Sequence, residues 1–276
     1  MTKCFIIVYS FALRIHGKMK IEAFGATDIG KKRSLNEDNY TCVNISKTTD
    51  SLYLLAVADG IGGHSGGEIA SSMAIAILEK NLLLHFQKNQ SASSHFQDII
   101  ENAFKEANRE IFQKASKEEN LTGMGTTLTA ALITPNEATI SNIGDSRAYL
   151  IRENSLHQIT LDHSWEAETR RNIILSKEEF KDSPFKHMLT RFLGFEQDVR
   201  IDTFHLQLFP GDHLILCTDG LYSLIPDKDI LKIFKRLKRT EKTCRELIHL
   251  ANKRGGGDNI TVVVASLPRT SRPGKP

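Results

Sequence analysis

The strongest constraint on the fold of this chain is the stretch at residues 52–68, LYLLAVADGIGGHSGGE. Residues 53–58 have the length and apolarity of a buried strand, and apolar residues recur at helical spacing after Glu68. The stretch therefore predicts a strand with an acidic end, then a glycine-rich loop and a helix. Because glycine lets the backbone turn sharply and approach a ligand closely, we expect Asp59 and the Gly60 carbonyl to face the same small ligand.

Three common uses of such a loop do not fit the sequence. Asp-Gly is a favoured hairpin turn, but here a helix-patterned segment follows the loop. A mononucleotide-binding loop requires a lysine directly after its last glycine, where this chain has Glu68. The dinucleotide-binding pattern starts at Gly60 and Gly62 but meets Ser65 in place of its third glycine. A carboxylate beside this loop suits a divalent cation better than a bare phosphate.

Length and composition indicate one large domain. The chain has 276 residues, of which 40% are hydrophobic and 25% charged, which is enough to bury a full core. A formal net charge of +3 is too small to predict a polyanionic partner. The cysteines lack the spacing of a zinc site or a secreted disulfide framework, so we expect a reducing cytoplasm, with Cys217 as a small core residue.

Both ends of the sequence are expected to lie outside the domain, which spans residues 19–268. Residues 5–13 are mostly apolar, but they are too short to span a bilayer and lack a small-residue cleavage site. We expect residues 1–18 to be a disordered or loosely packed extension and residues 269–276 a disordered tail. No stable membrane insertion is expected, although export or membrane association stays an alternative.

The order of the predicted elements favours an α+β fold with antiparallel sheets. Short β-branched runs separated by turns, without βαβ repeats, are typical of such sheets. Strands are expected at residues 20–27, 40–45, 53–58, 123–133, 138–151, 155–160, 200–208, 213–218 and 260–267. Helices are expected at residues 68–86, 96–111, 227–238 and 240–253. Residues 164–199 break the rhythm and predict an inserted flap over a sheet edge.

A polar turn at residues 28–39 holds several acids and Arg33. These side chains are able to bind metal or phosphate. A solvated loop explains the turn equally well.

Four aspartates are placed where strand ends should meet. Asp59 and Asp219 each end a buried strand, whereas Asp145 and Asp258 each follow a glycine and precede a strand. In antiparallel sheets the end of one strand lies beside the start of the next, so we expect the four acids to converge on one rim. Such a cluster repels itself unless cations bind it. An all-oxygen set favours Mg²⁺ or Mn²⁺ over zinc.

The assembled motifs resemble those of the metal-dependent protein serine/threonine phosphatases of type 2C, particularly the bacterial branch. Six motifs appear in the family's order and cover residues 19–267: DIGKKRSLNED at 28–38, VADGIGGHSGGE at 57–68, GMGTT at 123–127, GDSR at 144–147, TDG at 218–220 and GDNIT at 257–261. The resemblance implies a four-layer αββα sandwich of two antiparallel sheets flanked by helix pairs, with a small flap insertion and a metal cleft at one end.

The resemblance also implies two or three Mn²⁺ or Mg²⁺ ions. Asp59, Asp219 and Asp258 would hold one ion. Asp59, the Gly60 carbonyl and Glu37 would hold the second.

The remaining site residues are implied in the same way. Asp145 with Asp219 would make a third, weaker metal site. Asp38 would orient metal-bound water from behind the ligands. Arg33 would clamp the phosphate, because a guanidinium can grip phosphate with two hydrogen bonds.

The implied reaction is hydrolysis of phosphoserine and phosphothreonine in proteins. A metal-bridged hydroxide would attack phosphorus directly, without a phosphoenzyme. The implied partners are phosphorylated proteins, in opposition to a serine/threonine kinase.

Several positions depart from the family's pattern or carry no predicted role in catalysis. Ile61 stands where many eukaryotic relatives have a histidine thought to protonate the leaving group, so metal-bound water becomes the default acid. We expect His64 to fix its loop by hydrogen bonding and His163 to be structural. The flap has Ser183-Pro184 in an altered setting, so no substrate preference is implied.

Two other functions stay open. A catalytically weak, phosphatase-like regulatory or binding domain is the first, although the intact acidic set opposes it. A two-metal nuclease is the second, because residues 228–254 are rich in Lys and Arg. Apolar residues alternate with those charges, so ordinary solvated helix faces explain the segment and we expect no nucleic acid partner.

Overall fold

The computed structural model describes residues 21–46, 52–61, 66–88, 95–172, 188–237 and 239–268. The predictions for residues 1–18, residues 269–276, His64 and flap residues 173–187 lie outside these ranges.

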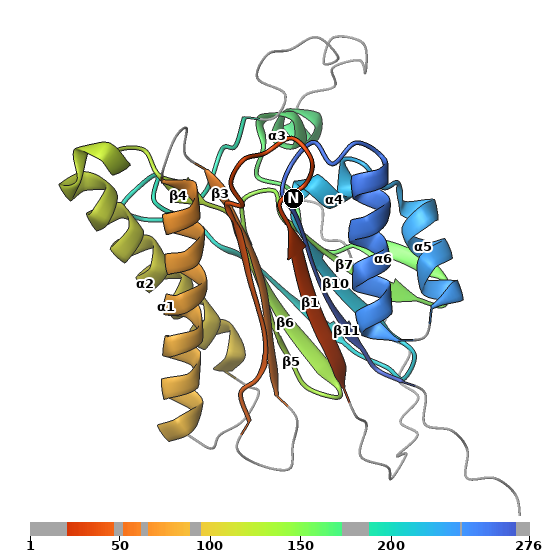
Figure 1. Ribbon diagram of the computed structural model, residues 1–276. Helices are drawn as coiled ribbons and strands as arrows, with labels where there is room; N and C mark the ends of the chain where they lie inside the picture. Colours follow the sequence, from red (N-terminus) through yellow and green to blue (C-terminus); the bar gives the residue numbers. More distant parts are fainter. Residues whose placement is uncertain are drawn as a thin grey trace, which may run out of the picture.

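Two antiparallel sheets stack face to face in the described part of the chain (Figure 1). One sheet has the strand order β1 (Glu22–Asp28), β11 (Ile260–Ser266), β10 (His213–Cys217), β7 (Arg147–Arg152), β8 (Ser155–Gln158). The other has the order β2 (Asp38–Asn44), β3 (Tyr53–Ile61), β5 (Leu128–Ile133), β6 (Glu137–Ile143), β9 (Asp202–Gln207), and the short β4 (Gly125–Thr126) pairs with β3.

A helix pair covers the outer face of each sheet (Figure 1). The β2–β3 sheet carries α1 (Gly67–Lys88) and α2 (Phe96–Lys117), and the β1–β11 sheet carries α5 (Asp227–Arg236) and α6 (Thr240–Lys253). Shorter elements are the 3₁₀ turn η2 (Glu119–Leu121), α3 (Trp165–Asn172) and α4 (Asp219–Tyr222). The predicted α+β fold with an αββα order is confirmed.

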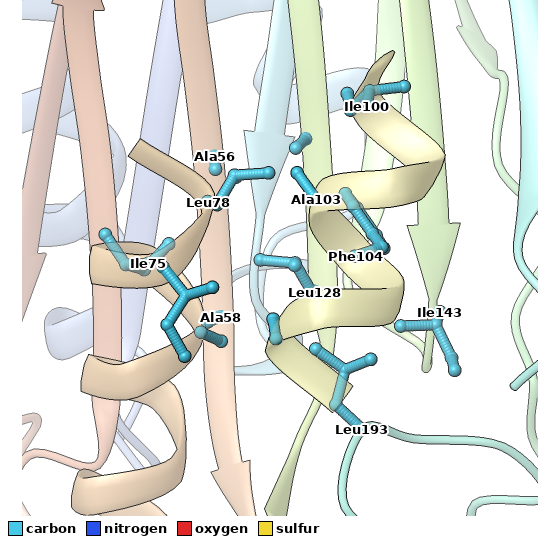
Figure 2. Close-up of a cluster of buried hydrophobic side chains, with 14 of the residues drawn as sticks. Ala56, Ala58, Ile75, Leu78, Ile100, Ala103, Phe104, Leu128, Ile143 and Leu193 are labelled. Atoms are coloured by element: carbon cyan, nitrogen blue, oxygen red, sulfur yellow. The ribbon is translucent and has the colours of Figure 1, made fainter. Parts of the chain in front are cut away.

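Strand β3 shows why its sequence is continuously apolar. Leu54, Ala56 and Ala58 face the α1–α2 pair, whereas Leu55 and Val57 face the other sheet. A strand buried on both faces needs apolar side chains at every position, not at alternate ones. Figure 2 shows the helix side of this core, where Leu128 of β5 and Phe104 of α2 join the β3 alanines.

Helix α1 is long and apolar enough to cross a membrane, with a mean hydropathy of 1.3 over residues 67–87. Its packing gives another reason for that composition. Ala70, Ala74, Leu78 and Leu82 are fully buried in the core beneath α1 and α2. The apolar sequence of α1 therefore serves the contact with the sheet and with its neighbouring helix.

The structure corrects four predicted boundaries. Strand β2 begins at Asp38, within the predicted polar turn, and β3 continues past Asp59 to Ile61 because Gly60 and Ile61 pair with β4. The predicted strand at 138–151 is two strands in different sheets, separated at Gly144, whose φ is 102°. Asp219 does not end a strand but begins the four-residue helix α4, which is too short to show helical periodicity.

Candidate active site

The predicted site residues gather at the end of both sheets where β4 and α4 lie (Figure 1). Asp38 and Asp59 face each other across the β2–β3 ladder. The charges of Asp38, Asp219, Asp145 and Asp258 all disfavour the ionised form of Asp59. Burial first, and then these neighbouring charges, raise the pKa of Asp59 well above its ordinary value.

The two carboxylate oxygens of Asp38 differ in their hydrogen bonding. Its Oδ2 accepts hydrogen bonds from the Thr218 hydroxyl at 2.8 Å and the Thr261 hydroxyl at 2.7 Å. Its Oδ1 is buried without a hydrogen-bond partner. Burial, opposed by the two threonine hydrogen bonds, raises the pKa of Asp38 to about 7. A buried bare carboxylate oxygen calls for a cation or a donor beside it.

The backbone of Asp59 is fixed by two threonines from the β4–β5 connection. Its N–H donates to the Thr127 hydroxyl at 2.9 Å, and its carbonyl accepts from the Thr126 hydroxyl at 2.9 Å. The Thr127 hydroxyl also bonds the Ser146 hydroxyl at 2.7 Å. Asp59 and the neighbour of Asp145 are therefore joined through one side chain.

Asp145 lies in the turn between β6 and β7. Burial and then the charge of Asp219 raise the pKa of Asp145 to about 7. Both effects disfavour the ionised carboxylate unless positive charge is nearby.

Glycines allow Glu37 to approach the start of α1. The Gly60 N–H donates to the Glu37 carbonyl at 3.2 Å. A Cβ on Gly60 would lie 2.7 Å from that carbonyl and even closer to the Gly67 carbonyl, and a Cβ on Gly67 would lie 2.5 Å from Glu37 Oε1. Gly60 and Gly67 therefore leave room for Glu37, whose carboxylate lies against Gly67.

Asn259 holds the loop that carries Arg33 and Glu37. Its Nδ2 donates to the Ile29 carbonyl at 2.9 Å and the Leu35 carbonyl at 3.0 Å, and its Oδ1 accepts from the Glu37 N–H at 2.9 Å. Asn259 thus fixes the backbone of the predicted polar turn, although residues 31–35 of that turn are exposed to solvent.

Arg33 lies at the site, with its guanidinium on Asp258. Its Nε is 2.9 Å from Asp258 Oδ1, and its Nη2 donates to Oδ2 at 2.9 Å. Arg33 Nη1 is 3.8 Å from Glu37 Oε2. A guanidinium uses the same two-bond grip for phosphate, so the geometry suits the predicted clamp.

The acids share a rim without closing into a cage. Within the described ranges, no three His, Cys, Asp or Glu side chains form a ready metal-binding group. The oxygen-only set and the bare buried Oδ1 of Asp38 fit a divalent cation.

Other residues of the site have structural roles. His163 is fully buried, its Nδ1 accepts from the Gly144 N–H at 3.1 Å and its Nε2 lies 3.1 Å from Asp202 Oδ2. Burial lowers the pKa of His163, so a neutral ring is favoured. His163 is structural, as predicted, and the buried Cys217 is a core residue.

Thr218, Thr261 and Asn259 lie within the sequence motifs, but the sequence predicted no role for them. The one indication of a role in the sequence is their position close to Asp219 or Asp258. Their partners lie more than 170 residues away in the chain, which no local pattern reveals.

The comparisons with known proteins point to one family. A family model described as protein phosphatase 2C matches residues 27–253. The serine/threonine phosphatase stp of Listeria monocytogenes is 36% identical over 251 residues, covering 89% of this chain and 96% of that protein.

Solved structures are similar over most of the chain. That of the Mycobacterium tuberculosis serine/threonine phosphatase PstP/Ppp has 32% identity and a TM-score of 0.78, and the match covers 90% of this chain and 99% of that one. A structure of the PstP catalytic domain in complex with two manganese ions has 32% identity and a TM-score of 0.76, covering 90% of this chain and 98% of that one.

Proposed function

The chain belongs to the protein phosphatase 2C family, and on that premise we propose that it hydrolyses phosphoserine and phosphothreonine in proteins by attack of a metal-bridged hydroxide on phosphorus, without a phosphoenzyme. Its similarity to serine/threonine phosphatases over most of the chain identifies it as a serine/threonine protein phosphatase. The proposal concerns the mechanism, which is direct, metal-dependent attack on phosphorus.

The observation that carries the proposal is the pairing of Asp38 with Asp59 at the centre of the acidic rim. Two carboxylates directly opposite each other on neighbouring strands destabilise a sheet. A site that keeps Asp38 buried opposite Asp59, with further acids around the pair, favours bound positive charge.

We propose two or three Mn²⁺ or Mg²⁺ ions as that charge. Asp59, Asp219 and Asp258 would hold one ion, and Asp59, Glu37 and the Gly60 carbonyl a second. The PstP catalytic domain, which has the same fold, holds two manganese ions. Bound divalent cations supply an activated water as nucleophile and offset the negative charge of the phosphoryl group.

A third ion would lie between Asp145 and Asp219. The charge of Asp219 acts on Asp145 more strongly than that of any other residue, which supports placing these two side chains around one ion.

The chain's own residues orient the reactants. Arg33 binds two phosphoryl oxygens with the fork that grips Asp258 here. Asp38 accepts a hydrogen bond at Oδ1 from the attacking water, while the two threonines keep Oδ2 in place. Ile61 has no proton to give, so water protonates the leaving serine or threonine oxygen.

Phosphorylated proteins are the substrates under this proposal, and a serine/threonine kinase supplies them. A reducing cytoplasm is the compartment that the cysteine pattern favours.

The test is phosphate release from phosphoserine, phosphothreonine and phosphotyrosine peptides with Mn²⁺ and with Mg²⁺. We expect release from the first two peptides with at least one metal and none after chelation. Metal binding without release from any peptide would favour the regulatory function instead.

A further inference from the structure

Tyr222, the last residue of α4, touches a predicted metal ligand on another element. Its hydroxyl donates toward the Asp145 carbonyl at 3.1 Å and toward Asp145 Oδ2 at 3.3 Å. Asp219 begins the same short helix, three residues earlier. Residues at this spacing lie on one helix face, so α4 presents one ligand and the anchor of another side by side.

The Tyr222 ring is itself held by a fixed cation. The Arg147 guanidinium carbon lies 3.6 Å from the ring centroid. Two of its nitrogens bind Asp162: Nε donates to Oδ1 at 3.0 Å and Nη2 to Oδ2 at 2.7 Å. Arg147 Nη1 also donates to the Tyr149 hydroxyl at 2.9 Å. The two-bond contact with Asp162 keeps the guanidinium over the ring.

Asp162 lies where the predicted flap begins, and the next residue is tied to the Asp145 turn. The His163 N–H donates to the Gly144 carbonyl at 3.0 Å, and the Gly144 N–H donates to His163 Nδ1 at 3.1 Å. The far end of the flap returns to the same place, because the Thr190 N–H donates to the His163 carbonyl at 2.9 Å. The base of the flap and the Asp145 turn therefore form one hydrogen-bonded unit.

We propose that Tyr222 is a positioning residue that holds Asp145 for the third divalent cation, and that the Asp162–Arg147 pair fixes Tyr222 from the base of the flap. This inference rests on the proposed function, because it takes Asp145 and Asp219 as ligands of that ion. A ligand side chain that is already held in place loses less conformational entropy when the ion binds. Removal of the Tyr222 hydroxyl should therefore lower the affinity for the third ion alone.

The test compares Tyr222→Phe with the wild-type chain by Mn²⁺ titration, using the electron paramagnetic resonance signal of the free ion. Phenylalanine keeps the ring under Arg147 and removes only the hydroxyl. The matched control is Tyr149→Phe, which removes a phenol hydroxyl from the same guanidinium without touching Asp145. Thermal unfolding of both variants reports whether each is folded.

We expect Tyr222→Phe to raise the dissociation constant of the most weakly bound of three Mn²⁺ ions roughly 10-fold. The dissociation constants of the other two ions should stay unchanged. Tyr149→Phe should leave all three dissociation constants as in the wild type. A Tyr222→Phe variant with three unchanged constants, or with all three weakened alike, overturns the inference.

The wild-type titration separates this inference from the proposed function. A wild-type chain that binds two ions and releases phosphate from phosphopeptides overturns the inference alone. A wild-type chain that binds none overturns both.

Discussion

Asp38 and Asp59 lie directly opposite each other on neighbouring antiparallel strands, with the remaining acids of the site around them. This arrangement is unfavourable without bound cations, because Asp38 is buried and its charge disfavours the ionised form of Asp59. Stability and function should therefore be opposed at this pair.

We predict that Asp59→Asn raises the melting temperature of the chelated protein and abolishes phosphatase activity. The amide removes one of two facing charges but cannot serve as an anionic ligand. Differential scanning calorimetry with a chelator measures the first effect. As a control, Asp98→Asn changes an exposed acid in the first turn of α2, and it should not raise the melting temperature. A chelated Asp59→Asn variant that melts below the wild type would contradict the account.

The chelated protein should also lose stability as the pH rises from about 4 to 7. Asp38 and Asp145 have pKa values raised from 3.8 to about 7, so the folded state binds more protons than the unfolded state across that window. Their contribution to stability is fully present below the ordinary pKa and is lost as the pH rises through the folded value. Melting temperatures in a pH series measure this slope. Asp38→Asn should flatten it, and saturating Mn²⁺ should abolish it.

Asn259→Ala should lower the free energy of unfolding by roughly 1–3 kcal/mol, because three part-buried hydrogen bonds of about 1 kcal/mol each are lost. The loop that carries Arg33 and Glu37 would lose its anchor, so activity should fall as well. Urea unfolding and phosphate release measure the two effects. Asn44→Ala removes an exposed side chain whose Oδ1 accepts from the Ser46 N–H, and it should change neither.

The fold followed from the sequence where the signal was local. The helix predicted at 240–253 has those bounds in the structure, and the apolar run at 53–58 is a buried strand. The rule that antiparallel strand ends meet predicted that the aspartates converge, although β3 runs past Asp59 and Asp219 begins α4. The two-bond contact of Arg33 with Asp258 and the loop anchor at Asn259 were not predicted, since each joins residues more than 220 positions apart. Helix α4 was missed because four residues show no periodicity.

Arg33→Lys should lower kcat/KM for a phosphothreonine peptide about 10- to 100-fold, because an ammonium cannot reproduce the two charge-assisted hydrogen bonds of a guanidinium. Most of the loss should appear in KM if Arg33 binds the phosphoryl group of the substrate. Steady-state kinetics with saturating Mn²⁺ measure it. Arg109→Lys, in an exposed pair with Glu106 on α2, is the matched control and should leave kcat/KM unchanged. Equal kinetics for the two variants would remove Arg33 from the phosphate site.

Asp219 is a proposed ligand of the cations that drive hydrolysis. The Asp219→Asn variant therefore shows whether hydrolysis depends on this metal site. The measurement is hydrolysis of p-nitrophenyl phosphate with saturating Mn²⁺ by the variant and the wild type, after thermal unfolding has shown both to be folded. The account predicts robust turnover for the wild type and none above background for Asp219→Asn. Near-normal turnover by the variant would contradict it.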